Sequence, residues 1–113
     1  MLVAFSVAPS GTGRSDGSVH DAVAAAVRVV RDSGLPSRTT SMFTEIEGEW
    51  DEVMDVVKRA TEAVAPFGSR VSLVLKADIR PGWTGELDAK IDRLETALAS
   101  AGADGDIPAD GAE

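Results

Sequence analysis

The hydrophobic pattern of this chain changes period several times, and the order of these changes restricts the fold more than any other feature. Residues 71–80 alternate apolar and polar side chains, which is the period of a strand with one buried face. Residues 2–8 alternate in the same way, and Pro9 is expected to end that strand. Residues 37–47 are rich in β-prone side chains, and they are long enough for two short strands or for one long bent strand.

Between these segments, apolar residues recur at helical spacing in three places. The first helix is expected to begin at Ser18, a candidate N-cap, and its apolar stripe consists of Val19, Val23, Ala26, Val27 and Val30. The second helix has the stripe Trp50, Val53, Met54, Val57, Ala60 and Val64. The third follows the turn "RPGWTG" and has the stripe Leu87, Ile91, Leu94 and Leu98, with Thr84 as a candidate cap and Glu86 paired with Lys90.

The resulting order is strand, helix, strand, strand, helix, strand, helix. This order predicts an α+β fold with a ferredoxin-like β-α-β-β-α-β antiparallel sheet and an added C-terminal helix. The two long helices then cover one face of the sheet, and a partner sheet or a ligand could cover the other. We expect one domain over residues 1–101 and a flexible acidic tail over residues 102–113.

The composition excludes several classes of partner. The chain has 113 residues and a formal net charge of −8, and this negative charge disfavours nucleic acid and anionic lipid. It contains no cysteine, so thiol catalysis and disulfides are ruled out, and a cytoplasmic location fits best. No apolar run approaches the ~20 residues of a membrane span.

Catalytic groups are scarce. The one histidine, His20, lies too close in sequence to Ser18 and Asp21, on one helical turn, for a catalytic relay. No metal-binding motif occurs, and the loop "SGTGRSDGS" lacks the ending of a phosphate-binding loop. We therefore predict no catalytic residue, no metal and no cofactor, and a protein that is not an enzyme.

The stretch "FTEIEGEWDEV" contains a concentration of carboxylates. Glu49, Asp51 and Glu52 are placed where acids stabilise the N-terminus of the second helix. Glu45 and Glu47 instead fall on a strand, with both side chains on the same side. They form either a charged edge that resists aggregation or a carboxylate site for a cationic or hydrogen-bond-donating ligand.

Several segments together resemble the small thiamine-binding (YkoF-like) family. They are "FSVAP" in the first strand, "SGLP" after the first helix, "TEIEGEWDEVMDVVKRA", and "RVSLVLKADIR" before the last helix. The resemblance spans roughly residues 2–98, and the central T-x-I-E-G-x-W-x-E-V block is its most specific part.

The resemblance implies a non-catalytic protein that binds thiamine or its pyrimidine moiety for transport, salvage or sensing. It also implies a homodimer or homotetramer that associates through the sheets. The positions that match its motifs are Ser6, Pro9, Thr44, Glu47 and Arg80, and Trp83 could add a stacking wall for the ligand, while Trp50 is expected in the core. Two alternatives stay open, an oligomeric metabolite-sensing module and a small cofactor-free enzyme of the same fold.

Overall fold

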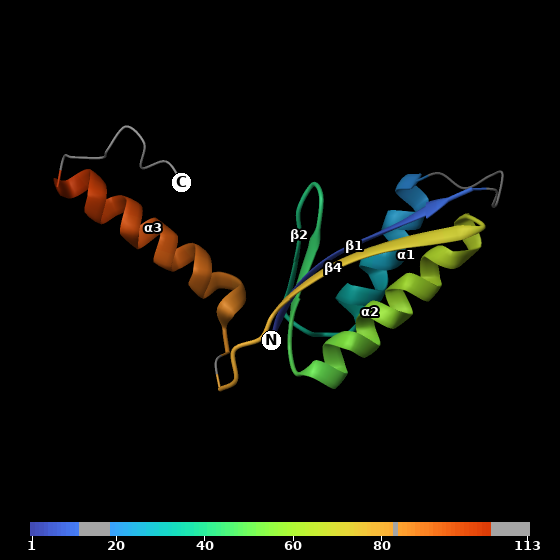
Figure 1. Ribbon diagram of the computed structural model, residues 1–113, viewed down its shortest axis with the longest axis horizontal. Coiled ribbons are helices and arrows are strands. Elements are labelled where there is room, and N and C mark those ends of the chain that lie inside the picture. Colours follow the sequence, from blue (N-terminus) through green and yellow to red (C-terminus); the bar gives the residue numbers. More distant parts are fainter. Residues whose placement is uncertain (12–18, 83, 105–113) are drawn as a thin grey trace.

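The computed structural model describes residues 1–11, 19–82 and 84–104. Its elements are β1 (Leu2–Ser10), α1 (Val19–Asp32), β2 (Ser37–Thr39), β3 (Thr44–Glu47), α2 (Trp50–Val64), the short 3-10 helix η1 (Ala65–Phe67), β4 (Arg70–Asp78) and α3 (Glu86–Asp104). Residues 37–47 thus form two short strands with a bend between them. The predicted order of strands and helices is confirmed (Figure 1).

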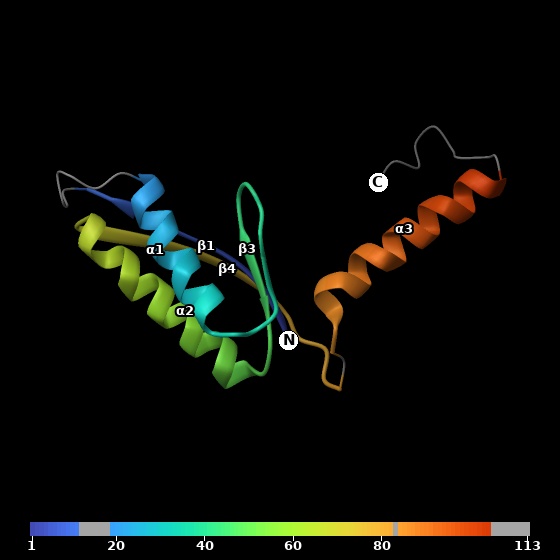
Figure 2. The same ribbon diagram turned by 180° about the vertical axis from the view of Figure 1, so that it is seen from behind.

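The four strands form one antiparallel sheet in the order β2-β3-β1-β4. Helices α1 and α2 lie together on one face of this sheet, and Figure 2 shows them in front of the strands, while Figure 1 looks onto the opposite, uncovered face. This arrangement is the predicted α+β, ferredoxin-like fold with an added C-terminal helix. We call the uncovered face the open sheet face; it contains Leu2, Ala4, Ser6 and Ala8 of β1 and Ser72, Val74 and Lys76 of β4.

The core lies between the sheet and the two helices. Val3, Phe5 and Ile46 point from the strands toward helix residues such as Val30 and Val53, and all five are almost fully buried. The predicted α1 stripe is only partly correct, because Val19 and Val23 are 62% and 43% exposed. Ser18, the candidate cap, lies outside the described residues.

Strand β1 does not end at Pro9 as expected, but continues to Ser10. Pro9 is opposite Val71 in β4. Beyond Phe5, no described residue pairs with β1 on the side of β3. Because a proline has no N–H group to donate to a neighbouring strand, it is tolerated in a strand where one edge has no strand partner.

The prediction that Trp50 belongs to the core is wrong. Trp50 is the first residue of α2 and is 53% exposed, whereas Val53 is the first fully buried residue of this helix. Glu49 and Glu52 form the capping box of α2, in which the Glu49 N–H donates to Glu52 Oε1 at 3.1 Å. The acids at this helix start therefore have the structural role that the sequence indicated.

Helix α3 leaves the body of the molecule after its first turn (Figure 1). The predicted Glu86–Lys90 pair is wrong, since Lys90 forms an ion pair with Asp78 of β4 and Glu86 pairs with Arg93 at 2.8 Å. The helix runs to Asp104, and the remainder of the expected tail lies outside the described residues. In the part of the chain that the structure describes, none of the helices is long and apolar enough to cross a membrane.

Candidate functional site

A groove of about 250 Å³ lies between the unpaired edge of β1, the tip of the β2–β3 hairpin and helix α1. We call it the hydroxyl groove, because five of its lining residues carry hydroxyl groups: Ser6, Thr39, Thr40, Ser41 and Thr44. Its apolar walls are Phe5, Val7, Ala8, Val19, Val23, Ala26, Val27, Met42 and Phe43. The groove is smaller than the ~300–1,000 Å³ pockets that hold drug-sized ligands, which suits one substituted ring.

The edge of β1 gives this groove main-chain hydrogen-bonding groups. Strand β3 pairs only with residues 2–5 of β1, so on this side residues 6–10 have no strand partner among the described residues. Backbone N–H and C=O groups in such an edge need partners, and extended peptides or planar ligands can supply them. Alternation along β1 directs the Ser6 side chain to the open sheet face, so Ser6 offers the groove its main chain.

Thr40 and Thr44 both line the groove, but they differ in whether their hydroxyl groups have hydrogen-bond partners. Thr40 Oγ1 donates to the Phe43 carbonyl at 2.9 Å and accepts from the Phe43 N–H at 3.2 Å, which closes the hairpin tip. Thr44 is 92% buried, and its hydroxyl has no hydrogen-bond partner within residues 1–11, 19–82 and 84–104. The Thr44 hydroxyl can both donate and accept a hydrogen bond, so it is available to a ligand that enters the groove.

Thr44 and Glu47, which the sequence placed in one site, do not point into the same cavity. They are three residues apart on β3, and a strand directs such residues to opposite faces. Glu47 lines a second groove of about 340 Å³ at the base of α3, together with Met1, Leu35, Pro36, Gly48, Glu49, Thr84, Gly85, Leu87 and Asp88. We call it the Glu47 groove.

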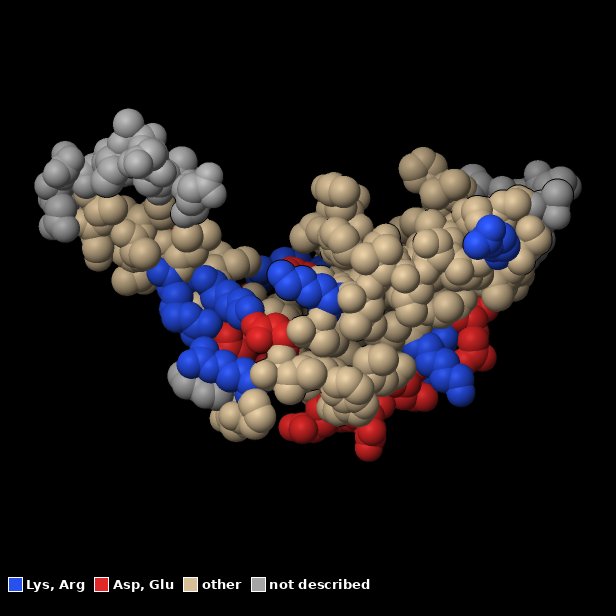
Figure 3. Space-filling model, in the orientation of Figure 1, with Lys and Arg blue, Asp and Glu red and all other residues tan. Residues whose placement is uncertain are grey.

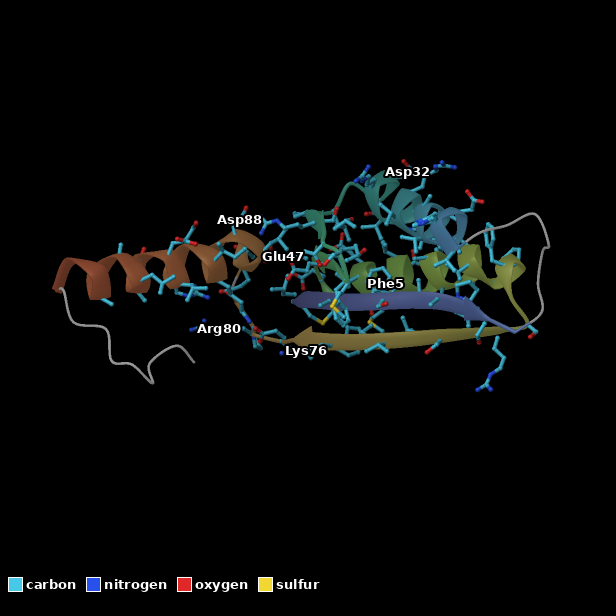
Figure 4. All side chains as sticks on the ribbon, turned by 90° about the horizontal axis from the view of Figure 1, so that it is seen from above. Phe5, Asp32, Glu47, Lys76, Arg80 and Asp88 are labelled. Atoms are coloured by element: carbon cyan, nitrogen blue, oxygen red, sulfur yellow. The ribbon has the colours of Figure 1, made fainter. Side chains whose placement is uncertain are left out.

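The Glu47 carboxylate already has a structural function. It is buried, and it accepts the N–H of Glu86 at 2.8 Å and the N–H of Leu87 at 3.3 Å. These two N–H groups belong to the start of α3, so Glu47 caps this helix from a neighbouring strand and faces the positive end of its dipole. Figure 4 shows Glu47 beside the base of α3, near Asp88.

Ion pairs surround the same helix start. Asp88 pairs with Arg38 of β2, and Lys90 with Asp78. The hydrogen bond from Lys90, with the attraction of its positive charge, holds the pKa of Asp78 below its usual value. The polar groups of the Glu47 groove are therefore largely engaged with one another.

The other predicted site residues lie apart from both grooves or outside the described chain. Arg80 borders a shallow hollow next to Trp50 and lies 3.9 Å from Glu86, with which it forms an ion pair. Pro9 lies near the far end of β1, where its Cβ would be 3.0 Å from a side chain added at Gly68. Trp83 lies outside the described residues.

Sequence reasoning missed the apolar wall of the hydroxyl groove. Val19, Val23, Met42 and Phe43 were assigned to a core stripe or to a β-prone run, yet Met42 is 75% exposed. Consecutive hydroxyl and apolar residues in "TTSMFT" were the available signal. His20 is exposed on α1, and the described residues contain no cluster of three or more groups that could hold a metal ion.

Fold and groove together define a small α+β protein with a ferredoxin-like sheet and a small groove bordered by apolar and hydroxyl-bearing residues. The chain matches the model of the family described as "Thiamine-binding protein" over residues 3–95. This chain belongs to that family.

The relatives agree with this membership. A UPF0045 protein of Mycobacterium bovis is 54% identical over 99 residues, covering 87% of this chain and 94% of the relative. A solved structure from Methanocaldococcus jannascii is 29% identical with a TM-score of 0.72, covering 83% of this chain and 94% of the other. A Thermotoga maritima structure, of a protein described as a candidate for thiamine biosynthesis or salvage, is 28% identical with a TM-score of 0.67, covering 82% and 96%.

Proposed function

We propose that this protein binds thiamine through its aminopyrimidine ring in the hydroxyl groove and carries out no reaction on it. The observation that carries the proposal is the position of Thr44, which lines a ring-sized hollow and whose hydroxyl has no hydrogen-bond partner among the described residues. Membership in the thiamine-binding family supports the choice of ligand.

The chemistry of the groove matches this ring. An aminopyrimidine has an amino donor beside ring nitrogen acceptors, and the free edge of β1 offers both C=O and N–H groups. Thr44 supplies one further hydrogen bond, and Phe5 and Phe43 supply apolar contact for the ring. The thiazolium cation would remain toward solvent, where a net charge of −8 favours it.

The non-catalytic part of the proposal follows from the side chains near the groove. Among the described residues that line it there is no acid, base or thiol, and proton transfer in an enzyme needs such a group within hydrogen-bond reach. We further propose transport, salvage or sensing as the role, in the cytoplasm, with self-association of the chain through its sheets. Neither a cofactor nor a metal is part of this proposal.

The test is isothermal titration with thiamine, and separately with its aminopyrimidine and thiazole halves. We expect saturable binding of thiamine and of the pyrimidine half only. Thr44→Val should weaken this binding roughly 2- to 10-fold, because one hydrogen bond is worth ~0.5–1.5 kcal/mol. Thr61→Val is the matched control, since its hydroxyl donates to the Val57 carbonyl at 2.8 Å within α2 and lies outside the groove.

A second pair of variants locates the ligand. Glu47→Gln alters the Glu47 groove, and it should leave the affinity for thiamine within about 2-fold of the unmodified chain. Binding that Glu47→Gln abolishes and Thr44→Val leaves unchanged would move the site to the Glu47 groove. Absence of thiamine binding, with saturable binding of another metabolite, would favour the metabolite-sensing alternative.

A further inference from the structure

A second hollow on helix α1 adjoins the hydroxyl groove. We call it the arginine hollow; it has a volume of about 450 Å³ and is lined by His20, Val23, Ala24, Val27, Arg28, Arg31 and Asp32. Val23 and Val27 line the hydroxyl groove as well. The two hollows therefore lie on either side of these valines, and a ligand longer than one ring can extend over them from one hollow to the other.

The spacing of side chains along α1 explains the arginine hollow. Its lining residues recur at three and four, so they form one stripe on the outer side of the helix. Ala24 lies four residues after His20 and four before Arg28, and its small side chain leaves space between these longer neighbours. Arg28 and Arg31 are one and four residues beyond Val27, which places them within about 6 Å of it along the helix axis.

The two arginines of this hollow are exposed cations that no acidic group neutralises. Within the described parts of the chain neither Arg28 nor Arg31 has an ion-pair partner. Like charges three residues apart on a helix repel each other. Asp32 is the acidic residue that lines the hollow, and it forms no ion pair with either arginine. The hollow thus has a net positive charge, although the formal net charge of the chain is −8.

The basic side chains at the base of α3 differ in this respect. In Figure 3 basic groups gather where α3 joins the body, beside acidic ones. Lys90 pairs there with Asp78, and Arg93 pairs with Glu86 at 2.8 Å. Helix α1 lies on the other face of the sheet, in front of the strands in Figure 2. Its two arginines remain available to an anion that approaches from the hydroxyl groove.

We propose that the arginine hollow holds a phosphate group of the ligand whose ring lies in the hydroxyl groove, so that this protein prefers a phosphorylated form of thiamine to thiamine itself. This inference rests on the proposed function, because the groove must anchor the ring. The hydroxyethyl arm that carries phosphate leaves the thiazolium ring at the end away from the pyrimidine. The planar guanidinium of an arginine offers paired N–H donors to phosphate oxygens. With the ring anchored, this contact becomes intramolecular and gains from a high effective concentration.

The test is isothermal titration of the full chain with thiamine and with thiamine monophosphate, at low and at physiological salt. We expect the monophosphate to bind about 3- to 10-fold more tightly at low salt, and this preference to shrink as salt screens the exposed charges. Arg28→Gln should remove most of the preference and leave the affinity for thiamine within about 2-fold. Lys58→Gln is the matched control, because it removes an exposed positive charge of α2 that lines neither hollow.

A variant of opposite sign completes the test. Asp32→Asn removes the negative charge that lines the hollow, so it should strengthen binding of the monophosphate about 2-fold and leave binding of thiamine unchanged. Equal affinities for the two ligands in the unmodified chain, or a preference that Arg28→Gln leaves intact, would overturn this inference while the proposed function stands. Binding of neither ligand would overturn both.

Discussion

Removal of the Glu47 carboxylate should detach helix α3 without unfolding the core. Glu47 accepts two N–H groups of α3, at 2.8 and 3.3 Å, and lies at the positive end of the helix dipole. A hydrogen bond to a charged group contributes about 1.5–3 kcal/mol, and the longer bond contributes less. The carboxylate also loses hydration on burial, so we expect Glu47→Ala to destabilise the docked helix by about 2–4 kcal/mol, and Glu47→Gln by about 1–2 kcal/mol.

The assay is amide hydrogen exchange at Glu86 and Leu87, because a local opening of α3 does not require global unfolding. A loss of about 2 kcal/mol corresponds to exchange roughly 30-fold faster at these two amides. Amides of β1 and β4 should keep their protection. Glu45→Ala is the matched control, since Glu45 lies two residues away on the same face of β3 and accepts no bond from α3. Exchange at Glu86 and Leu87 that rises less than about 3-fold in Glu47→Ala, or rises equally in Glu45→Ala, would refute the capping role.

Three further predictions concern the body of the fold. Ile46 has no exposed surface, so Ile46→Val should cost about 0.5–1.5 kcal/mol in urea unfolding, and an unchanged midpoint would contradict its place in the core. A Cβ at Gly68 would lie 2.6 Å from the Ser10 carbonyl oxygen, so Gly68→Ala should cost about 1–3 kcal/mol, and a neutral result would show that β1 can shift there. Because Lys90 lowers the pKa of Asp78, the stability from this pair is present above the unfolded pKa of about 4 and is lost as the pH falls through the lower, folded pKa. Between about pH 5 and pH 3, Asp78→Asn should therefore lose less unfolding free energy than the unmodified chain in urea titrations.

The sequence predicted the fold well, because each element has a clear period and the turns are marked by Gly and Pro. It failed at Pro9, since a proline signals the end of a strand unless one edge is free, and a free edge depends on how far β3 extends along β1. It failed at Trp50 for a related reason. Periodicity shows which side of a helix faces the sheet, but it does not show where the sheet ends.

The candidate site was predictable only in part. Thr44 and Glu47 share one motif, and their odd spacing on a strand already indicated opposite faces. The capping role of Glu47 could not be inferred in this way, because its partners Glu86 and Leu87 lie 39 and 40 residues further along the chain. The groove itself needs the hairpin tip, whose residues have no periodic signal.

The apolar stripe of α3 shows most clearly what a periodic pattern leaves open. The apolar residues of α3 follow the same spacing as the buried stripe of α2; they are Leu87, Ile91, Leu94 and Leu98. The sequence pattern therefore does not distinguish a helix that packs on its own core from a helix whose stripe stays exposed or meets a partner. The sheet has two faces, and α1 and α2 occupy one of them. The cap supplied by Glu47 fixes the first turn of α3 at the edge of the sheet and directs the rest of the helix away from it (Figure 1). With its start held in this way, α3 does not lie on its own open sheet face, and Ile91, Leu94 and Leu98 stay exposed although their spacing is that of a buried stripe.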